Sequence, residues 1–272
     1  MNMQPGRAGL VRSNGPAWLV AVAILVATFC APAAEAADIR VMISGGLSAA
    51  YKELVPQFEK MTGNTVITSY GPSMGNTENA IPIRLARGEP ADVLIMVGDA
   101  LSVMISKGYA DSGSRVDLVR SPIGMVVRAG AVKPDISTPE ALKATLLSAK
   151  SIAYSDSASG VYVGTELFKR LDIASEMEGK ARMIPAEPVA GVVARGDAEL
   201  GFQQISELLP IPGADLVGPL PPELQKITIF SAALTKDGKA REQGKALIDF
   251  LASAAAAPAL VKSGMEPVAP TR

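Results

Sequence analysis

The chain has 272 residues, of which 48% are hydrophobic, 4% aromatic and 19% charged, and its formal net charge is −1. The near-neutral balance and the few aromatic side chains exclude the concentrated basic surface that nucleic-acid binding requires. The sequence has no histidine, so the commonest general base and the commonest metal ligand of proteins are both missing.

The first 36 residues have the pattern of a secretory signal peptide. Arg7 and Arg12 precede an apolar run over residues 17–30, and Ala34-Glu35-Ala36 follows as an A-x-A cleavage sequence. The run is too short to cross a bilayer well as a membrane helix. We therefore predict a signal peptide over residues 1–36 and a periplasmic mature protein. Cys30, the single cysteine, leaves with the signal peptide, so we expect no disulfide.

Strand-like and helix-like segments alternate along the first part of the mature chain. Periodicity predicts strands over residues 39–43, 66–70 and 91–97 and helices over residues 49–61, 80–87 and 100–107. In the first helix, Tyr51, Leu54 and Phe58 recur at helical spacing, and Gly63-Asn64 is a typical end signal.

The same alternation continues to the end of the chain. We predict strands over 123–128, 151–154, 181–184, 200–203 and 227–234, and helices over 138–149, 161–171, 189–195 and 240–262, the last broken at Pro258. Thr138 is the expected N-cap and Pro139 the expected first residue of its helix. This order predicts an α/β protein with mostly parallel sheets.

Three turns rich in small residues follow predicted strands, at residues 44–46, 71–76 and 155–160. Ligands of open α/β sheets bind at the carboxyl ends of strands, where the next helix exposes unpaired N–H groups and the positive end of its dipole. Small residues let an anion approach that backbone closely. The pattern therefore favours a site for a small anion.

The order of these elements, together with Arg87-Gly88-Glu89-Pro90-Ala91-Asp92-Val93 and the segments 185–189 and 201–207, resembles the periplasmic molybdate-binding proteins of ABC importers. The resemblance implies a type II, Venus-flytrap fold of two lobes that closes on its ligand. Its expected parts are lobe 1 at 37–119 plus 235–272, crossover strands at 120–128 and 226–234, and lobe 2 at 129–225. It further implies a monomer without a cofactor that delivers a small anion to an ABC permease in the inner membrane.

Ligand contacts carried over from that family fall in the first two turns and in the second lobe. The positions are Ser44, Gly46, Ser73, Asn76, Ser159, Gly160, Val189 and Gln204. Gly46 stands where the family has a serine, and Gln204 stands near the position of a tyrosine. These departures from the molybdate pattern leave room for a different anion.

Two arginines point to the alternative ligand, a small organic carboxylate. Arg84 follows the second turn and Arg120 lies at the first crossover, and either could form a bidentate contact with a carboxylate if it faced the cleft. A solvated surface position is the competing interpretation for both residues.

An exported serine hydrolase is the competing enzyme hypothesis, because Gly71-Pro72-Ser73-Met74-Gly75 matches G-x-S-x-G after a strand. That chemistry needs a base for the Ser73 proton, and the sequence contains neither a histidine nor an S-x-x-K motif. The carboxylates Asp156 and Glu187 are interpreted as caps or lobe contacts. We therefore expect a binding protein and not an enzyme, with no metal site.

Overall fold

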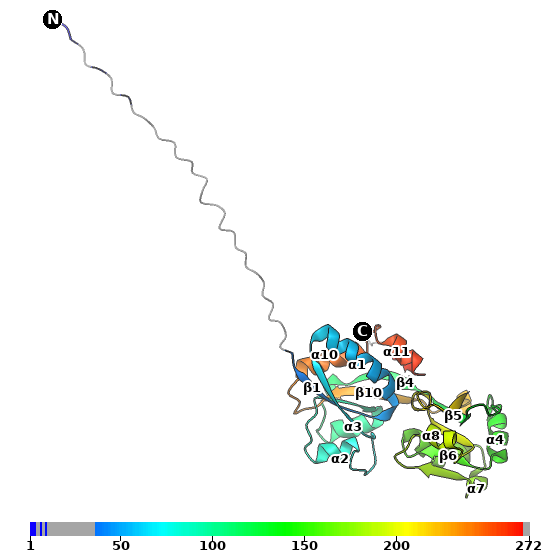
Figure 1. Ribbon diagram of the computed structural model, residues 1–272. Coiled ribbons are helices and arrows are strands. Elements are labelled where there is room, and N and C mark those ends of the chain that lie inside the picture. The colour runs from blue at the N-terminus through cyan, green and yellow to red at the C-terminus, as the bar shows by residue number, and fades with distance from the viewer. Residues whose placement is uncertain (4–5, 7–8, 10–35, 269–272) are drawn as a thin grey trace. The chain divides into compact units, whose positions relative to one another are not determined.

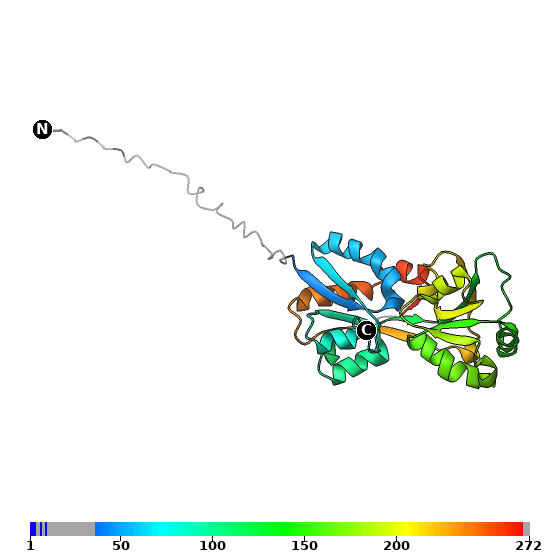
Figure 2. The ribbon, with the colours of Figure 1, turned by 60° about the horizontal axis from the view of Figure 1, so that its bottom comes forward.

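The computed structural model describes residues 1–3, 6, 9 and 36–268, and the predicted signal peptide lies almost wholly outside them. The chain divides into two units, of which the second begins at Ala36. The second unit contains two lobes, each built on one β-sheet that is flanked by helices (Figure 1, Figure 2). The two-lobed α/β fold that the sequence predicts is confirmed.

The sheet of the first lobe is formed by segments that are far apart in the sequence. In spatial order its strands are β11 (Glu266–Pro267), β4 (Val116–Ser121), β10 (Thr228–Leu234), β3 (Val93–Val97), β1 (Asp38–Ile43) and β2 (Thr65–Tyr70). β1 is parallel to both β2 and β3, whereas β10 is antiparallel to β3 and β4. The carboxyl ends of β1, β2 and β3 therefore meet at one edge, where the first two small-residue turns lie.

The second sheet has the same mixed character. In spatial order its strands are β7 (Ala181–Ile184), β6 (Ile152–Ser155), β8 (Leu200–Gln204), β5 (Ile123–Arg128) and β9 (Ala214–Pro219). β6 is parallel to β7 and β8, and β5 is antiparallel to β8 and β9. Two connections join the lobes: β4 runs into β5 through Pro122, and the chain returns from the second sheet into β10.

Helices cover both faces of each sheet. In the first lobe they are α1 (Ser48–Thr62), α2 (Ile81–Ala86), α3 (Gly98–Ser106), α10 (Arg241–Leu251) and α11 (Ala257–Lys262), with short 3-10 turns η1 (Gly45–Leu47) and η2 (Ser112–Ser114). In the second lobe they are α4 (Pro139–Ser148), α5 (Ala158–Tyr162), the π-turn η3 (Val163–Leu167), α6 (Phe168–Arg170), α7 (Ala174–Met177), α8 (Val189–Arg195), α9 (Ile205–Leu208) and the 3-10 turn η4 (Pro222–Leu224).

Strand residues alternate between two apolar layers, which is why the strands are apolar on both faces. In β1, Ile39 and Val41 pack in the core under α1 and α10, while Met42 packs in the core under α2 and α3. In β5, Met125 and Val126 likewise enter opposite cores of the second lobe. This two-faced burial is typical of sheets that are covered by helices on both sides.

The local predictions hold where sequence signals are strong. Gly63 ends α1 with a positive φ of 75°, and the Thr138 hydroxyl accepts a hydrogen bond from the N–H of Ala141 at the start of α4. The segment predicted as one helix over 161–171 is a continuous run of α5, η3 and α6 that begins three residues earlier.

Three expectations are wrong. Five of the nine strand pairings in the described residues are antiparallel, because the strands that link the lobes run against their neighbours, so the sheets are not mostly parallel. The break predicted at Pro258 in the helix over 240–262 lies earlier, between Leu251 and Ala257, and Pro258 stands in the first turn of the second helix. Strands β4 and β9 were not predicted as elements, since neither has a clear alternation of apolar and polar residues. The residue limits of the lobes stay a prediction.

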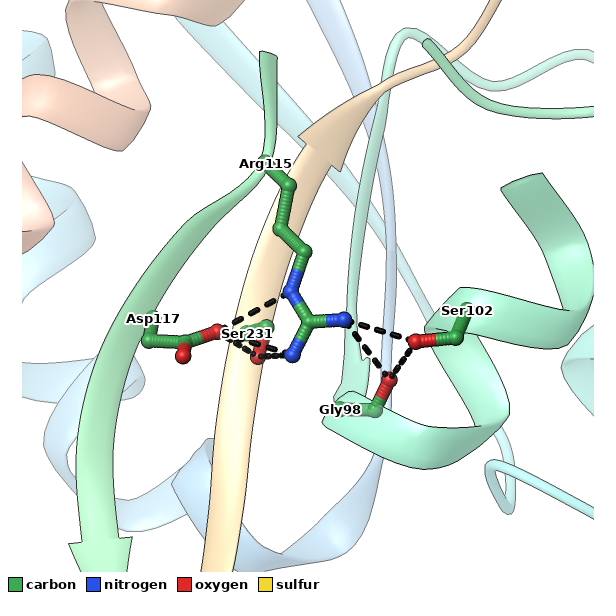
Figure 3. Close-up of polar contacts among 5 residues, drawn as sticks. All are labelled: Gly98, Ser102, Arg115, Asp117 and Ser231. Carbon is green, nitrogen blue, oxygen red and sulfur yellow. Dashed lines mark hydrogen bonds and ion pairs between the residues drawn. The ribbon is translucent and has the colours of Figure 1, made fainter. Parts of the chain in front are cut away.

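A network of hydrogen bonds connects the two strands of the first lobe that lead to and from the second lobe. The guanidinium of Arg115, just before β4, donates to Asp117 on β4 at 3.0 Å and to Ser231 on β10 at 3.3 Å, and Ser231 in turn donates to Asp117 at 2.5 Å (Figure 3). It also reaches Ser102 and the carbonyl of Gly98 on α3. One planar fork therefore bonds β4, β10 and α3 together.

Replacing Arg115 with alanine is expected to lower the free energy of unfolding by about 2 kcal/mol, because the fully buried Ser231 and the start of α3 lose a charged donor. Denaturant unfolding followed by circular dichroism measures the change. Arg115→Lys keeps the charge without the fork and should lose an intermediate amount. Equal stability of wild type and Arg115→Ala would contradict this role.

Candidate functional site

A cavity of about 590 Å³ is lined by residues of both lobes. In the first lobe its walls come from the ends of β1, β2 and β3, and in the second lobe from the segments that follow β6, β7 and β8. These are carboxyl ends of strands, where the fold class places its ligands. The cavity is therefore the candidate functional site.

The structure brings four of the ten predicted site residues to this cavity. Ser44, Gly46, Ser73 and Gln204 line it, whereas Asn76, Arg84, Arg120, Ser159, Gly160 and Val189 are not among its lining residues. From the segments that contain the remaining predictions, Thr77, Asn79, Ser157 and Ala158 line the cavity instead. The predicted turns border the cavity, and four of the predicted residues line it together with neighbours that were not predicted.

The first lobe presents Ser73 and Gly46 in a fixed arrangement. The Ser73 hydroxyl accepts a hydrogen bond from the N–H of Val97 at 2.9 Å, so its own proton remains available to a ligand. Gly46 lies against the ring of Phe230, and a Cβ added there would overlap that ring. In the described residues, neither a carboxylate nor a lysine is bonded to Ser73, which gives the hydrolase hypothesis no base.

The serines of the third turn form a cluster of their own. Ser155 Oγ lies 2.7 Å from Ser157 Oγ and 3.1 Å from Ser159 Oγ. Ser159 is 1% exposed. Gly160 packs so closely on Ser155 that a Cβ would overlap the Ser155 carbonyl oxygen. Ser159 and Gly160 therefore shape the turn that carries Ser157 to the cavity wall.

Both arginines considered for carboxylate binding are engaged elsewhere. Arg84 forms an ion pair with Glu89 and donates to the carbonyl of Asn79 at 3.1 Å. Arg120 pairs with Glu266 at 3.4 Å and has a half-exposed side chain. These contacts correspond to the surface interpretation that the sequence left open.

At the start of α8, a backbone hydrogen bond fixes the side chain of Gln203, which in turn contacts the carboxyl group of Glu207. The N–H of Val189 donates to Gln203 Oε1 at 3.0 Å, which leaves the amide nitrogen of Gln203 to bond the carboxyl group of Glu207. Val189 thus holds Gln203, and Gln203 holds Glu207 at the cavity wall.

Glu207 is the titratable group of the cavity whose environment is most unusual. Removal from bulk water, and to a smaller extent the charge of Asp156, raise the pKa of Glu207 from 4.5 to about 7, although the hydrogen bond from Gln203 opposes the shift. Its Oε1 lies against Gly45 of the first lobe, where an added Cβ would overlap it. At neutral pH this carboxyl group can therefore both accept and release a proton.

Gln204 lies where the two connections between the lobes meet. The side-chain amide of Gln204 has hydrogen-bond partners for both its nitrogen and its oxygen in one orientation. In that orientation Nε2 donates to Ser121 Oγ at 2.9 Å and to the Ser121 carbonyl at 3.0 Å, and Oε1 accepts from Thr228 Oγ1 at 2.7 Å. Ser121 ends β4 and Thr228 begins β10. The amide at the family's tyrosine position therefore joins the two crossovers to the base of the cavity.

The remaining charges of the cavity are distributed unevenly. Lys52 is the single basic residue that lines it, and its ammonium lies 5.2 Å from the ring centroid of Tyr70. Asp156 accepts from the N–H of Ala186 at 3.0 Å, and Glu187 pairs with Arg195 at 2.6 Å. Both of these acids have protein partners, and within residues 36–268 the ammonium of Lys52 forms no ion pair with a carboxylate, so it is available to an anionic ligand.

Some of these residues could have been found from the sequence. Lys52 follows Ser48 by four residues on the predicted helix, so helical periodicity places it on the face that borders the first turn. Gln203 could be noted from the sequence as an amide that both donates and accepts, whereas Ser206 and Glu207 had no such signal, because α9 begins directly after β8 without the glycine or serine turn that marked the other strand ends.

Within residues 36–268, no group of three or more Asp, Glu, His or Cys side chains is arranged to hold a metal ion. No helix in that part of the chain has the length and apolar character required to span a membrane.

Comparison with known proteins places this architecture in a family. The bacterial extracellular solute-binding proteins match residues 39–266. The chain belongs to this family. Membership agrees with a location outside the cytoplasm, whereas secretion through residues 1–36 stays a prediction.

Relatives of this solute-binding protein include both an enzyme and transport components. An aconitate isomerase of a Pseudomonas species is 48% identical over 253 residues, which are 93% of this chain and 97% of that protein. A molybdate-binding protein of Azotobacter vinelandii is 28% identical over 239 residues, 85% of this chain and 90% of that protein. The solved structure of an Azotobacter vinelandii periplasmic molybdate-binding protein has a TM-score of 0.67 at 20% identity and covers 86% of this chain and 100% of that one.

The raised pKa of Glu207 makes the stability of the solute-binding protein depend on pH. Between pH 4.5 and about 7 the folded chain binds more protons at Glu207 than the unfolded chain does, so this residue lowers stability as pH rises through that window. Glu207→Gln removes the ionisation. We expect the variant to melt above wild type at pH 8, with a difference that shrinks towards pH 4.5.

Differential scanning calorimetry at several pH values measures this difference. Glu178→Gln, an exposed position outside the cavity, is the matched control and should show no pH-dependent difference. A constant offset between Glu207→Gln and wild type from pH 4.5 to 8 would argue against a raised pKa.

Proposed function

We propose that the protein binds a small polycarboxylate in the cavity and interconverts the cis and trans forms of aconitate. The Pseudomonas aconitate isomerase, which is 48% identical along almost its whole length, supports the substrate. The proposal departs from the expectation of a pure binding protein. The observation that carries it is the carboxyl group of Glu207 in the cavity wall, with its pKa raised to about 7.

The chemistry requires only a proton carrier. Aconitate has a C=C bond, a methylene group and three carboxylates on a three-carbon frame. Removing a proton from the methylene carbon spreads the electron pair over this frame, and returning a proton to the formerly vinylic carbon moves the double bond to the other arm. The product is again aconitate. The rotation of the methylene arm when its proton leaves decides whether the new double bond is cis or trans.

Glu207 has the properties of that proton carrier. Its ionised form can take the methylene proton, and its neutral form can return a proton to the other arm, so one group serves both half-reactions without an oxidant, a reductant or a cofactor. An operating pH near the pKa favours both directions of transfer. Gln203 positions the carboxyl group, and the contact with Gly45 keeps it at the junction of the lobes.

Lys52 supplies the positive charge that a polycarboxylate requires. It lies at the cavity wall over the ring of Tyr70. Because Lys52 and Glu207 form no ion pair in the described residues, its ammonium can attract one carboxylate of the substrate while Glu207 remains available as the base. A volume of about 590 Å³ also suits a branched organic acid, since a tetrahedral oxyanion would occupy only a small part of it.

Delivery of a small anion to an ABC permease is the second candidate function. It is favoured by the family match over residues 39–266 and by the molybdate-binding relative at 28% identity. Ser73, with its available hydroxyl proton, fits an oxyanion as well as a carboxylate. Gly46 and Gln204 do not offer the hydroxyl groups carried by that family, and this weighs against molybdate.

Purified residues 37–272 are expected to convert trans-aconitate into cis-aconitate, which chromatography of the product mixture detects. Glu207→Gln should reduce kcat about 10²- to 10⁴-fold, the usual contribution of a general acid–base group. For wild type, kcat/KM should rise with pH through about 7, because the free protein needs the ionised carboxylate.

The control for this assay is Glu178→Gln, which lies outside the cavity and should retain wild-type rates. A thermal-shift screen with molybdate, sulfate and small carboxylates runs in parallel. Stabilisation by molybdate together with the absence of aconitate turnover would favour the delivery function and contradict the isomerase.

Lys52→Gln is expected to weaken polycarboxylate binding about fivefold at low ionic strength, the scale of an exposed charge pair, and to flatten the dependence of Kd on salt. Isothermal titration with trans-aconitate measures both effects. Lys60→Gln, on the exposed far end of the same helix, is the matched control. Identical Kd values for the two variants would remove Lys52 from the site.

A further inference from the structure

Two buried serine hydroxyls of the cavity have no hydrogen-bond partner within the part of the chain that the structure describes. They are Ser44 Oγ and Ser206 Oγ, on side chains that are 4% and 1% exposed. Both residues line the cavity. A buried hydroxyl without a partner costs free energy, so two such groups at one cavity indicate that a ligand is their partner.

The two hydroxyls come from opposite lobes and flank the same contact. Ser44 precedes Gly45, and Ser206 precedes Glu207, whose Oε1 lies against Gly45. The pairs Ser44-Gly45 and Ser206-Glu207 therefore adjoin each other at the cavity wall. A ligand group beside the carboxyl group of Glu207 is consequently within the region that both serines border.

Ser73 and Ser157, which also line the cavity, differ from these two serines because their hydroxyl groups have hydrogen-bond partners. Ser73 accepts from the N–H of Val97, and Ser157 bonds Ser155 and Ser159. Hydroxyl groups also have a particular advantage next to Glu207. They donate hydrogen bonds to an anion without adding a positive charge, and a cation there would stabilise the ionised carboxylate and weaken it as a base.

We propose that Ser44 and Ser206 donate hydrogen bonds to one and the same carboxylate of the ligand, the carboxylate next to the carbon that Glu207 deprotonates. The inference rests on the proposed function and deepens it. As the proton leaves, negative charge develops on this carboxylate, and two fixed donors stabilise that charge. Because the donors belong to different lobes, the same contact favours the closed arrangement of the site.

The test measures binding apart from turnover. Propane-1,2,3-tricarboxylate has the carboxylates of aconitate but no double bond, so isothermal titration with it reports affinity alone. Ser44→Ala and Ser206→Ala should each raise its Kd about 10- to 100-fold, the range for a lost hydrogen bond to a charged group. Without ligand, both variants should melt at or above the wild-type temperature, because an unpartnered buried hydroxyl has been removed.

Matched controls are Ser106→Ala in the first lobe and Ser148→Ala in the second, whose exposed hydroxyls bond their own helices outside the cavity. They should bind like wild type. Unchanged Kd in the cavity variants, or a fall of their ligand-free melting temperature without loss of affinity, would overturn the assignment.

The double variant tests whether one carboxylate receives both bonds. If it does, the second substitution should cost less affinity than it does alone, and the double-mutant cycle shows coupling. Additive losses would mean two separate ligand groups and overturn the shared contact. Failure of the wild type to bind the tricarboxylate or to isomerise aconitate would instead contradict the proposed function. A wild type that does both, with unaffected serine variants, would contradict this inference alone.

Discussion

The contact between Glu207 and Gly45 is the interaction on which the site depends. A carboxyl group from the second lobe rests on a residue of the first lobe that has no side chain, and a Cβ at that position would overlap its oxygen. Glu207 lines the cavity between the lobes, and its removal from bulk water is the largest cause of its pKa being raised to about 7. The packing of the two lobes and the pKa of Glu207 are therefore connected, since the contact with Gly45 is one of those that surround this carboxyl group.

The sequence predicted the scaffold of this site well. Apolar periodicity located eight of the eleven strands in the described residues, and the small-residue turns after β1 and β2 line the cavity. Such signals are local, since a buried strand or an N-terminal turn is encoded by neighbouring residues. Strands β4 and β9 were missed because neither Val116–Ser121 nor Ala214–Pro219 has a clear alternation of apolar and polar residues or a continuous apolar run.

The side chains of the site were predicted less well, for a physical reason. Whether Arg84 faces a cleft or a neighbouring acid depends on where Glu89 lies after folding, and no spacing rule specifies that position. Glu207 was not predicted as a site residue, because its pKa depends on burial and on Asp156, a residue 51 positions earlier in the chain. Electrostatic roles depend on tertiary neighbours and therefore appear only when both lobes are in place.

The same scaffold can serve oxyanion capture or proton transfer, and the difference lies in how charge is handled. A cage of neutral donors holds a fully ionised anion and needs no group that titrates near neutral pH. This cavity keeps such a donor in Ser73 and adds Glu207, which titrates there, while Lys52 supplies a cation at a separate point of the wall. Two further acids line the cavity, and both have protein partners. Asp156 accepts a hydrogen bond from the N–H of Ala186, and Glu187 forms an ion pair with Arg195. On the proposed function, one carboxyl group at the junction of the lobes supplies the proton carrier that this binding fold would need, in a sequence that contains no histidine.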